Sequence, residues 1–209
     1  MIRTVVGSFD SISEAASAAR DLRAAGFMDN DVSVIANNQQ RPADSSADSS
    51  VEVTEPDKVS GTATGIVAGG ALGGAAGLAA SLMGLAIPGI GPILAAGPIA
   101  AALAGAGAGA VAGGLIGGLT DAGVSETHAE YYAEAVRRGG ALVTVRADDA
   151  RADEAEAIIR RHGAFDIEDR ATQWKSTGWT GYNPEAEPYS FEEIERDRTQ
   201  YRASPDMRR

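Results

Sequence analysis

The first part of the chain alternates between strand-like and helix-like apolar patterns. Residues 4–9 (TVVGSF) and 31–36 (DVSVIA) are rich in β-branched residues and predict two strands, with a helix between them. Ser11 and Glu14 form a capping box at the start of this helix, and Gly26 marks its end. Residues 1–37 are therefore predicted to form a βαβ unit, the first half of an α+β domain.

Residues 121–171 show a related pattern in the order αβαβ. Ser125 is expected to cap a helix that ends at Gly139, and residues 141–147 (ALVTVRA) predict a half-buried strand. A helix over 151–164 and a short strand at 165–169 follow. Two strands rarely bury enough surface to stand alone, so we expect both halves to share one ferredoxin-like, four-stranded antiparallel sheet with helices on one face.

Between these halves lie a polar segment, 38–60, predicted to be a flexible linker, and an apolar block, 61–120, predicted to be a glycine-zipper helical hairpin. There is no charged residue between Lys58 and Asp121. The glycines that recur at every fourth position are Gly61, Gly65, Gly69, Gly73 and Gly77 in a first helix, and Gly105, Gly109, Gly113 and Gly117 in a second. The turn between the helices is assigned to Pro88, Gly89, Gly91, Pro92 and Pro98.

Each glycine inside a helix costs about 1 kcal/mol relative to alanine, and close helix packing recovers that cost. The glycine stripes are therefore predicted to be helix-packing and oligomerisation surfaces. Helices over 61–87 and 98–119 would be about 40 Å and about 33 Å long, enough to cross a hydrocarbon core of about 30 Å. Insertion into or association with a membrane is the first interpretation. Packing of several copies into a soluble bundle or filament, and packing within one chain, are the alternatives.

Charge and composition narrow the classes of partner and chemistry. The formal net charge of −11 disfavours nucleic acid and anionic lipid headgroups as electrostatic partners. The chain has no cysteine, which excludes disulfides, thiolate nucleophiles and zinc–thiolate clusters. An acidic residue, Asp10, interrupts the N-terminal apolar stretch, so no export signal is expected.

No residue pattern in the chain indicates catalysis, a cofactor or a metal. The two histidines, His128 and His162, have no ligand spacing around them, and Glu154 and Glu156 lie on a charged helix face. A ligand-binding loop at Gly7 is less favoured than a simple turn glycine, and no Gly-Lys-Ser/Thr sequence follows the glycine-rich stretches. We therefore assign no catalytic residue, no metal site and no cofactor.

The C-terminal segment, 172–209, holds about half of the aromatic residues and is predicted to dock through them and one aliphatic residue: Trp174, Trp179, Tyr182, Tyr189, Phe191, Ile194 and Tyr201. Ser190 and Glu193 form a capping box that predicts a short helix. Its own domain, a neighbouring subunit and another protein are all candidate docking surfaces.

Three stretches together resemble the bacterial general stress (heat-induced, YflT-like) protein family: residues 4–27 (TVVGSFDSISEAASAARDLRAAGF), the central block 86–115, and 137–149 (RRGGALVTVRADD) with 152–164. This resemblance implies a stress-associated, non-enzymatic bacterial protein. We expect its hairpin to mediate membrane association and homo-oligomerisation on the cytoplasmic side of the inner membrane. The alternatives are a soluble self-assembling stress protein in the cytoplasm and a ferredoxin-like ligand-sensing module.

Overall fold

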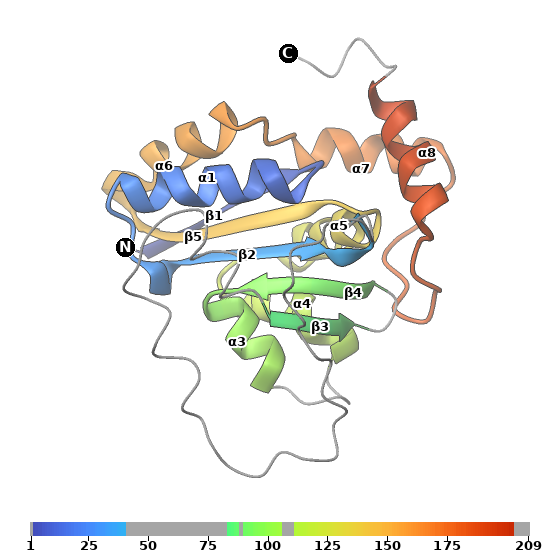
Figure 1. Ribbon diagram of the computed structural model, residues 1–209, viewed down its shortest axis with the longest axis horizontal. Helices are drawn as coiled ribbons and strands as arrows, with labels where there is room; N and C mark the ends of the chain where they lie inside the picture. The colour runs from blue at the N-terminus through green and yellow to red at the C-terminus, as the bar shows by residue number, and fades with distance from the viewer. Residues whose placement is uncertain (1, 41–82, 88–89, 106–110, 203–209) are drawn as a thin grey trace, which may run out of the picture.

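The computed structural model describes residues 2–40, 83–87, 90–105 and 111–202, which form an α+β domain (Figure 1). Five strands make up its antiparallel sheet: β1 (Ile2–Phe9), β2 (Val32–Asn37), β3 (Met83–Ile87), β4 (Gly91–Ala96) and β5 (Ala141–Asp148). Seven α-helices surround the sheet in the described ranges: α1 (Ile12–Ala24), α3 (Pro98–Gly105), α4 (Val111–Asp121), α5 (Glu126–Arg137), α6 (Asp149–Arg161), α7 (Ile167–Ser176) and α8 (Phe191–Arg202).

The strand order is β1-β5-β2-β4-β3, so the two halves of the chain share one sheet as expected. β5 lies between β1 and β2 and is antiparallel to both, with Val5 opposite Val145 in β1 and Val32 opposite Val145 in β2. The sheet is larger than the predicted four strands because the central apolar block adds β4 and β3 beyond β2.

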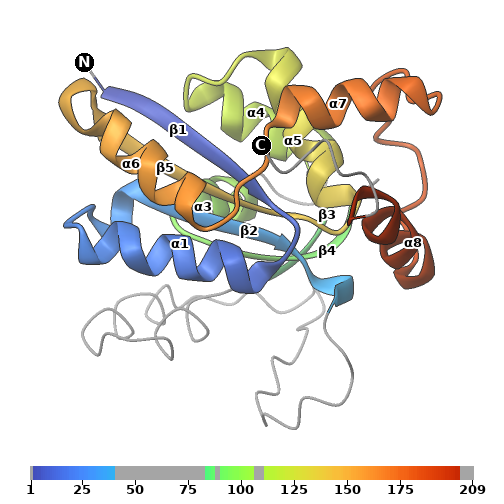
Figure 2. The ribbon, with the colours of Figure 1, turned by 90° about the horizontal axis from the view of Figure 1, so that it is seen from above.

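Helices cover both faces of this sheet, which corrects the expectation of helices on one face only. Small and aliphatic residues of α1 and α6 pack on one face of β1, β5 and β2. α3, α4 and α5 pack on the other face, against side chains such as Ile35, Ile93 and Leu142 (Figure 2). β2 is buried along its whole length because it lies inside the sheet with helices on both sides.

The helices of the two outer halves begin and end at the capping residues that the sequence predicts. The hydroxyl of Ser11 accepts a hydrogen bond from the backbone N–H of Glu14, and that of Ser125 accepts one from His128 N–H, each at 3.3 Å. Gly26 and Gly139 follow the ends of α1 and α5 with φ of 91° and 90°. A left-handed conformation is favourable for glycine, so these residues end the helices.

The predicted helical hairpin is wrong over its described part. Residues 83–87 and 91–96 form two antiparallel strands, with Leu85 opposite Ile93, where the end of one helix and the turn were expected. Gly91 and Pro92 lie in β4, while Pro88, Gly89 and residues 61–82 lie outside the described residues. Pro98 begins a helix, as predicted.

The predicted helix over 98–119 is replaced by two short helices that fold back on one another. A Cβ placed on Gly114 would lie 3.0 Å from Leu103 Cδ2, although residues this far apart in one continuous helix would be separated by about 16 Å. Ile99, Leu103, Leu115 and Leu119 are buried against the sheet and α5. In the described ranges, no helix is long and apolar enough to cross a membrane.

The predicted strand at 165–169 is also wrong. Phe165 makes an isolated β-bridge with Ser8 at the outer edge of β1, and α7 begins two residues later. The carboxylate of Asp166 accepts hydrogen bonds from the backbone N–H groups of Glu168 and Asp169, at 2.8 and 3.2 Å. This N-cap favours a helix over continuation of the strand.

Candidate functional site

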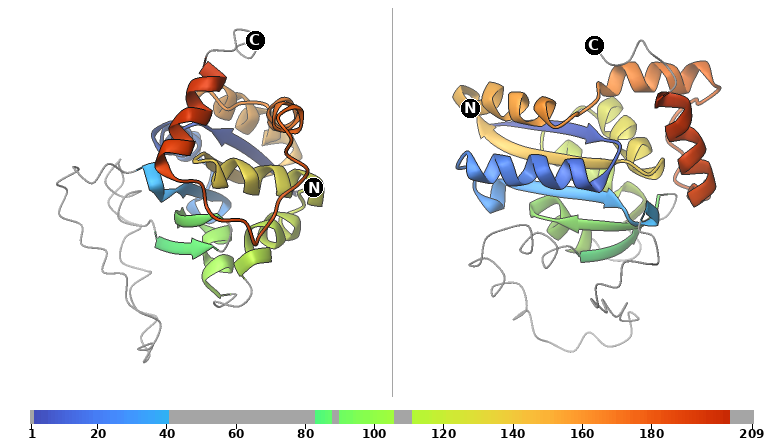
Figure 3. Two further views of the ribbon diagram at one scale, coloured as in Figure 1. Left: turned by 90° about the vertical axis from the view of Figure 1, so that its right-hand side faces the viewer. Right: turned by 45° about the horizontal axis from the view of Figure 1, so that its top comes forward.

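The C-terminal aromatic residues gather on α5. Trp174 in α7 is 1% exposed and packs with Ala135 and Ile167. Trp179 meets the Trp174 ring edge-to-face, with ring centroids 5.7 Å apart. The segment after α7 and then α8 pass across one end of the sheet (Figure 3). The described part of the tail therefore docks on its own chain.

A buried ion-pair network lies at the centre of this docking surface. Glu134, in the last turn of α5, is fully buried, and its carboxylate accepts a hydrogen bond of 2.7 Å from Arg138 Nε. Arg137 approaches the same carboxylate at 3.3 Å. Burial opposes the charge of Arg138, but the neighbouring Glu134, Tyr189 and Asp197 side chains together more than offset this and raise the pKa of the guanidinium.

Two tail tyrosines cover the exposed side of this network. The Tyr189 ring lies under both guanidinium groups, 4.7 Å from Arg137 and 5.0 Å from Arg138, in a cation–π arrangement. Arg137 also donates to the backbone carbonyl of Glu187 at 2.9 Å. Burial raises the pKa of Tyr182 to about 12 and also raises the pKa of Tyr189. Both phenols are therefore held in the neutral form.

The predicted capping box of α8 is present. The backbone N–H of Ser190 donates to the Glu193 carboxylate at 2.8 Å, and the backbone N–H of Glu193 donates to the Ser190 hydroxyl at 3.3 Å. The hydrogen bond from the Ser190 backbone holds the pKa of Glu193 below its usual value. Ile194 is fully buried, whereas Phe191 is 48% exposed, and the side chain of Tyr201 lies outside the described part of the chain.

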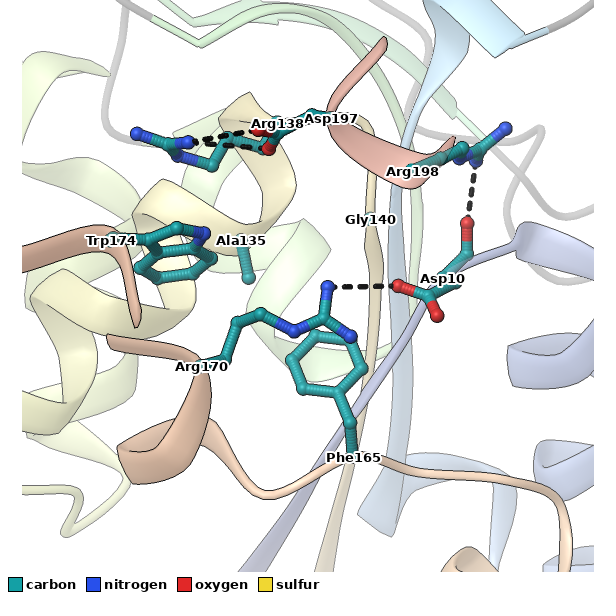
Figure 4. A pocket seen from close by; sticks show the side chains of 9 residues that line it. All are labelled: Asp10, Ala135, Arg138, Gly140, Phe165, Arg170, Trp174, Asp197 and Arg198. Atoms are coloured by element: carbon teal, nitrogen blue, oxygen red, sulfur yellow. Dashed lines mark hydrogen bonds and ion pairs between the residues drawn. The ribbon is translucent and has the colours of Figure 1, made fainter. Parts of the chain in front are cut away.

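Charged groups of α8 contact both α5 and the end of β1. Asp197 pairs with Arg138 at 3.2 Å, and Arg198 donates to the backbone carbonyl of Asp10 at 2.5 Å. Arg170 of α7 pairs with the Asp10 carboxylate at 3.2 Å and lies over the Phe165 ring. These groups line a small pocket beneath α8 (Figure 4), formed by Asp10, Ala135, Arg138, Gly140, Phe165, Arg170, Trp174, Asp197 and Arg198.

The predicted glycines do not form one continuous stripe in the described part of the chain. Gly105 ends α3, and Gly113 and Gly117 lie in α4. Gly61, Gly65, Gly69, Gly73, Gly77 and Gly109 lie outside the described residues. A Cβ at Gly118 would lie 3.4 Å from Ile99 Cγ2, and the Gly114 position is closer still, whereas a Cβ at Gly117 meets no described atom within 4 Å. Gly114 and Gly118 therefore make the contact with α3, and each lies one position after a predicted glycine, Gly113 or Gly117.

The other candidate positions serve structural roles. Gly7 lies inside β1 rather than in a loop, packed against Ile159 of α6. The Nε2 atom of His162 is 2.9 Å from the Asp21 carboxylate, and this hydrogen bond lowers the pKa of Asp21. In the residues that the structure describes, no group of three His, Cys, Asp or Glu side chains is placed to hold a metal ion.

His128 joins the N-cap of α5 to α7. Its Nδ1 is 2.6 Å from the Ser125 hydroxyl, and its Nε2 is 2.9 Å from the carboxylate of Glu168. The order Ser-His-Glu superficially matches a hydrolytic triad. However, the hydroxyl already serves as the helix cap, and the Glu168 side chain is 71% exposed. The geometry is that of a surface hydrogen bond beside a helix cap.

Sequence reasoning missed the buried Glu134 network and the pocket beside it. In the sequence, residues 133–136 are three apolar residues around one glutamate; in the structure all four are buried, so the acid in this turn must be paired. Comparisons of the chain with protein-family models, with curated proteins and with solved structures find no match.

Proposed function

We propose that this chain is a non-enzymatic bacterial stress-response protein that acts by self-association, with the outer edge of β3 as its contact. β3 is the last strand of the sheet, and β4 pairs with one of its edges. No other strand in the described ranges pairs with the second edge. Its sequence, MGLAI, contains no charge and no proline. An edge of this kind presents unpaired N–H and C=O groups to another chain.

The opposite edge of the same sheet is protected. β1 carries the charged residue Arg3, and its far end is bridged by Phe165 at Ser8. Charged side chains and local coverage are the usual devices by which proteins prevent edge-to-edge pairing. The contrast between the two edges supports β3 as the site of self-association.

The topology supports a ferredoxin-like unit with an inserted segment. β1, α1 and β2 form a βαβ unit whose two strands flank β5, and α6 then packs on the same face as α1. Residues 38–140 form the insertion between β2 and β5. In this proposal the insertion extends the ferredoxin-like sheet to the edge where copies meet, and the preceding glycine repeat, 61–77, adds to the contact.

The self-association proposal is tested by placing a charge on the edge strand. Gly84 is exposed, and a Cβ there meets no described atom within 4 Å, so Gly84→Lys is compatible with the monomer fold. Sedimentation over a range of concentrations should show oligomers for the native chain and a shift to monomer for Gly84→Lys. Gly117→Lys adds the same charge at another uncrowded glycine and should retain the oligomer. A monomeric native chain at all concentrations contradicts this proposal.

Membrane association is the second candidate. It is favoured by the uncharged stretch between Lys58 and Asp121, of which residues 61–77 carry the four-residue glycine repeat. Residues 98–119 do not form the second predicted span, so association must depend on 61–82. Flotation with lipid vesicles, followed by carbonate extraction of cell membranes, tests it. Protein that stays at the bottom of the gradient and is fully extracted contradicts this candidate.

The stress-response role is tested in cells. Loss of the chain should reduce survival of a heat challenge, and the native chain should restore it. Gly84→Lys should fail to restore survival if self-association is the working mechanism, whereas Gly117→Lys should succeed. Equal survival with and without the chain contradicts a role in heat stress.

A further inference from the structure

The pocket beneath α8 is lined by cationic and anionic side chains together. Arg138 and Arg170 reach it from the C-cap of α5 and from α7, and both are among the least exposed charged residues of the described chain. Arg198 reaches it from α8 itself and leaves the pocket when that helix moves. With α8 in place the cavity encloses about 10 Å³, which is room for roughly one water molecule. A ligand larger than water can therefore enter only when α8 moves.

One hydrogen-bond donor in the pocket, the indole N–H of Trp174, has no acceptor among the described residues. Trp174 is 1% exposed, and its indole Nε1 has no hydrogen-bond partner among the described residues. Figure 4 shows this nitrogen turned toward the interior of the pocket, on the wall next to Ala135. A buried N–H without an acceptor is costly, so the position favours an incoming oxygen.

Two carboxylates face the arginines of the pocket. Asp10 pairs with Arg170 and does not belong to α8. α8 supplies Asp197, which pairs with Arg138. Both carboxylate oxygens of Asp197 lie within 3.4 Å of Arg138 Nη1. Ile194 is the one described residue of α8 that is fully buried. A helix of this length is marginal on its own, so α8 depends on these contacts to stay folded. Removal of the Asp197 carboxylate from Arg138 should therefore weaken the docking of the helix, which Arg198 also holds through the carbonyls of Asp10 and Gly139.

We infer that this pocket is a binding site for a phosphate group, that Asp197 is its resident competitor, and that phosphate binding displaces α8. An intramolecular carboxylate acts at a high effective concentration, so a ligand that replaces it must bind the arginines more strongly. A phosphate dianion carries more charge than a carboxylate and accepts paired hydrogen bonds from guanidinium groups. This site does not depend on self-association through β3.

Tryptophan fluorescence gives a specific readout, because the two tryptophans of the chain, Trp174 and Trp179, both lie at this site. The full chain is titrated with inorganic phosphate, and sodium chloride at matched ionic strength is the control. A parallel titration with phenyl phosphate distinguishes free phosphate from an organic phosphate monoester. Saturable binding that chloride does not reproduce is expected for at least one of the two.

Variants separate the pocket from general electrostatics. Asp197→Asn removes the competitor and should lower the apparent Kd by about tenfold, the effect of about one charge–charge contact. Asp153→Asn makes the same charge change on an exposed position of α6 and should leave the Kd unchanged. Arg170→Gln should abolish saturable binding, with circular dichroism used to check that the variant is folded.

Limited trypsin digestion tests the displacement of α8. Phosphate should accelerate cleavage after Arg196 and Arg198, because a released helix exposes these bonds. The inference is overturned if neither the native chain nor Asp197→Asn shows saturable phosphate binding. It is also overturned if phosphate slows cleavage in α8, since binding would then occur without displacing the helix.

Discussion

Asn37 and Val136 join the two ends of the segment inserted between β2 and β5. The Asn37 side-chain Nδ2 donates to the Val136 carbonyl at 3.0 Å, and the Asn37 backbone N–H donates to the carbonyl of Gly140 at 3.2 Å. The inserted segment follows β2 at Asn37 and ends where β5 begins, at Ala141, and its own strands β3 and β4 extend the same sheet. One buried amide thus closes the insertion where both halves of the sheet meet.

Replacement of Asn37 by alanine should destabilise the whole domain. The side chain is 2% exposed, and its loss leaves the Val136 carbonyl without this donor, which costs about 1–3 kcal/mol of unfolding free energy. Urea denaturation followed by circular dichroism measures the change. Asn30→Ala, at an exposed position, is the matched control and should change stability by less than about 0.5 kcal/mol. Equal effects of the two changes would contradict this role of Asn37.

Gly97→Ala should be among the most damaging glycine substitutions. Gly97 has a φ of 93°, and an added Cβ would collide with the Val32 carbonyl oxygen and lie 2.7 Å from Ser33 Cα. Strain and overpacking together should cost about 2–5 kcal/mol. Gly123→Ala shares the positive φ but has open space among the described atoms, so thermal unfolding of this control isolates the strain. If both variants lose the same stability, the close approach to β2 is unimportant.

Glu134→Gln should destabilise the fold and loosen the tail. The change leaves Arg137 and Arg138 without their buried carboxylate, a loss of about 3–5 kcal/mol for a buried pair. Glu156→Gln removes an exposed ion pair to Arg160 and should cost less than about 1 kcal/mol. Chemical denaturation gives both values, and tryptophan fluorescence reports whether the tail leaves α5. A neutral Glu134→Gln variant would show that the network does not hold the tail.

Tail docking should weaken at high pH. Burial raises the pKa of Tyr182 to about 12 from its ordinary 10.0 and also raises that of Tyr189. Between pH 10 and 12 the unfolded chain loses the Tyr182 proton that the folded chain keeps, so the stability from this group, present below pH 10, is lost as pH rises through about 12. Tyrosinate absorbance should therefore show late-titrating phenols, and Tyr182→Phe should remove one of them. Titration of every tyrosine near pH 10 would contradict the buried positions.

The elements that could be predicted from the sequence are those controlled by neighbouring residues. Ser11, Ser125 and the Ser190–Glu193 pair each start a helix, because a capping hydrogen bond joins residues three positions apart. The βαβ half and β5 were also predicted, from the apolar pattern of their own residues, whereas α6 begins two residues and ends three residues earlier than predicted. The expectation that both halves share one sheet was also correct.

The central block could not be predicted from periodicity. Residues 83–96 are apolar throughout, and such a run suits a membrane helix and a buried strand equally well. Glycine and proline correctly indicated a break, but not that the segments on its two sides are paired strands. The free edge of β2 decided the outcome, because Val34 pairs with Ala96 there and Gly97 fits against the β2 backbone.

The sequence by itself determined where most helices and strands of the two outer halves begin and end, because local hydrogen bonds and chain entropy act within a few residues. Only the tertiary structure decided that the apolar block extends the sheet, that Gly114 rather than Gly117 contacts α3, and that Glu134 is buried between two arginines. These outcomes depend on contacts between segments far apart in the chain. The free energy that stabilises these contacts comes from apolar surface buried between distant segments, and no local pattern of residues specifies which segments meet.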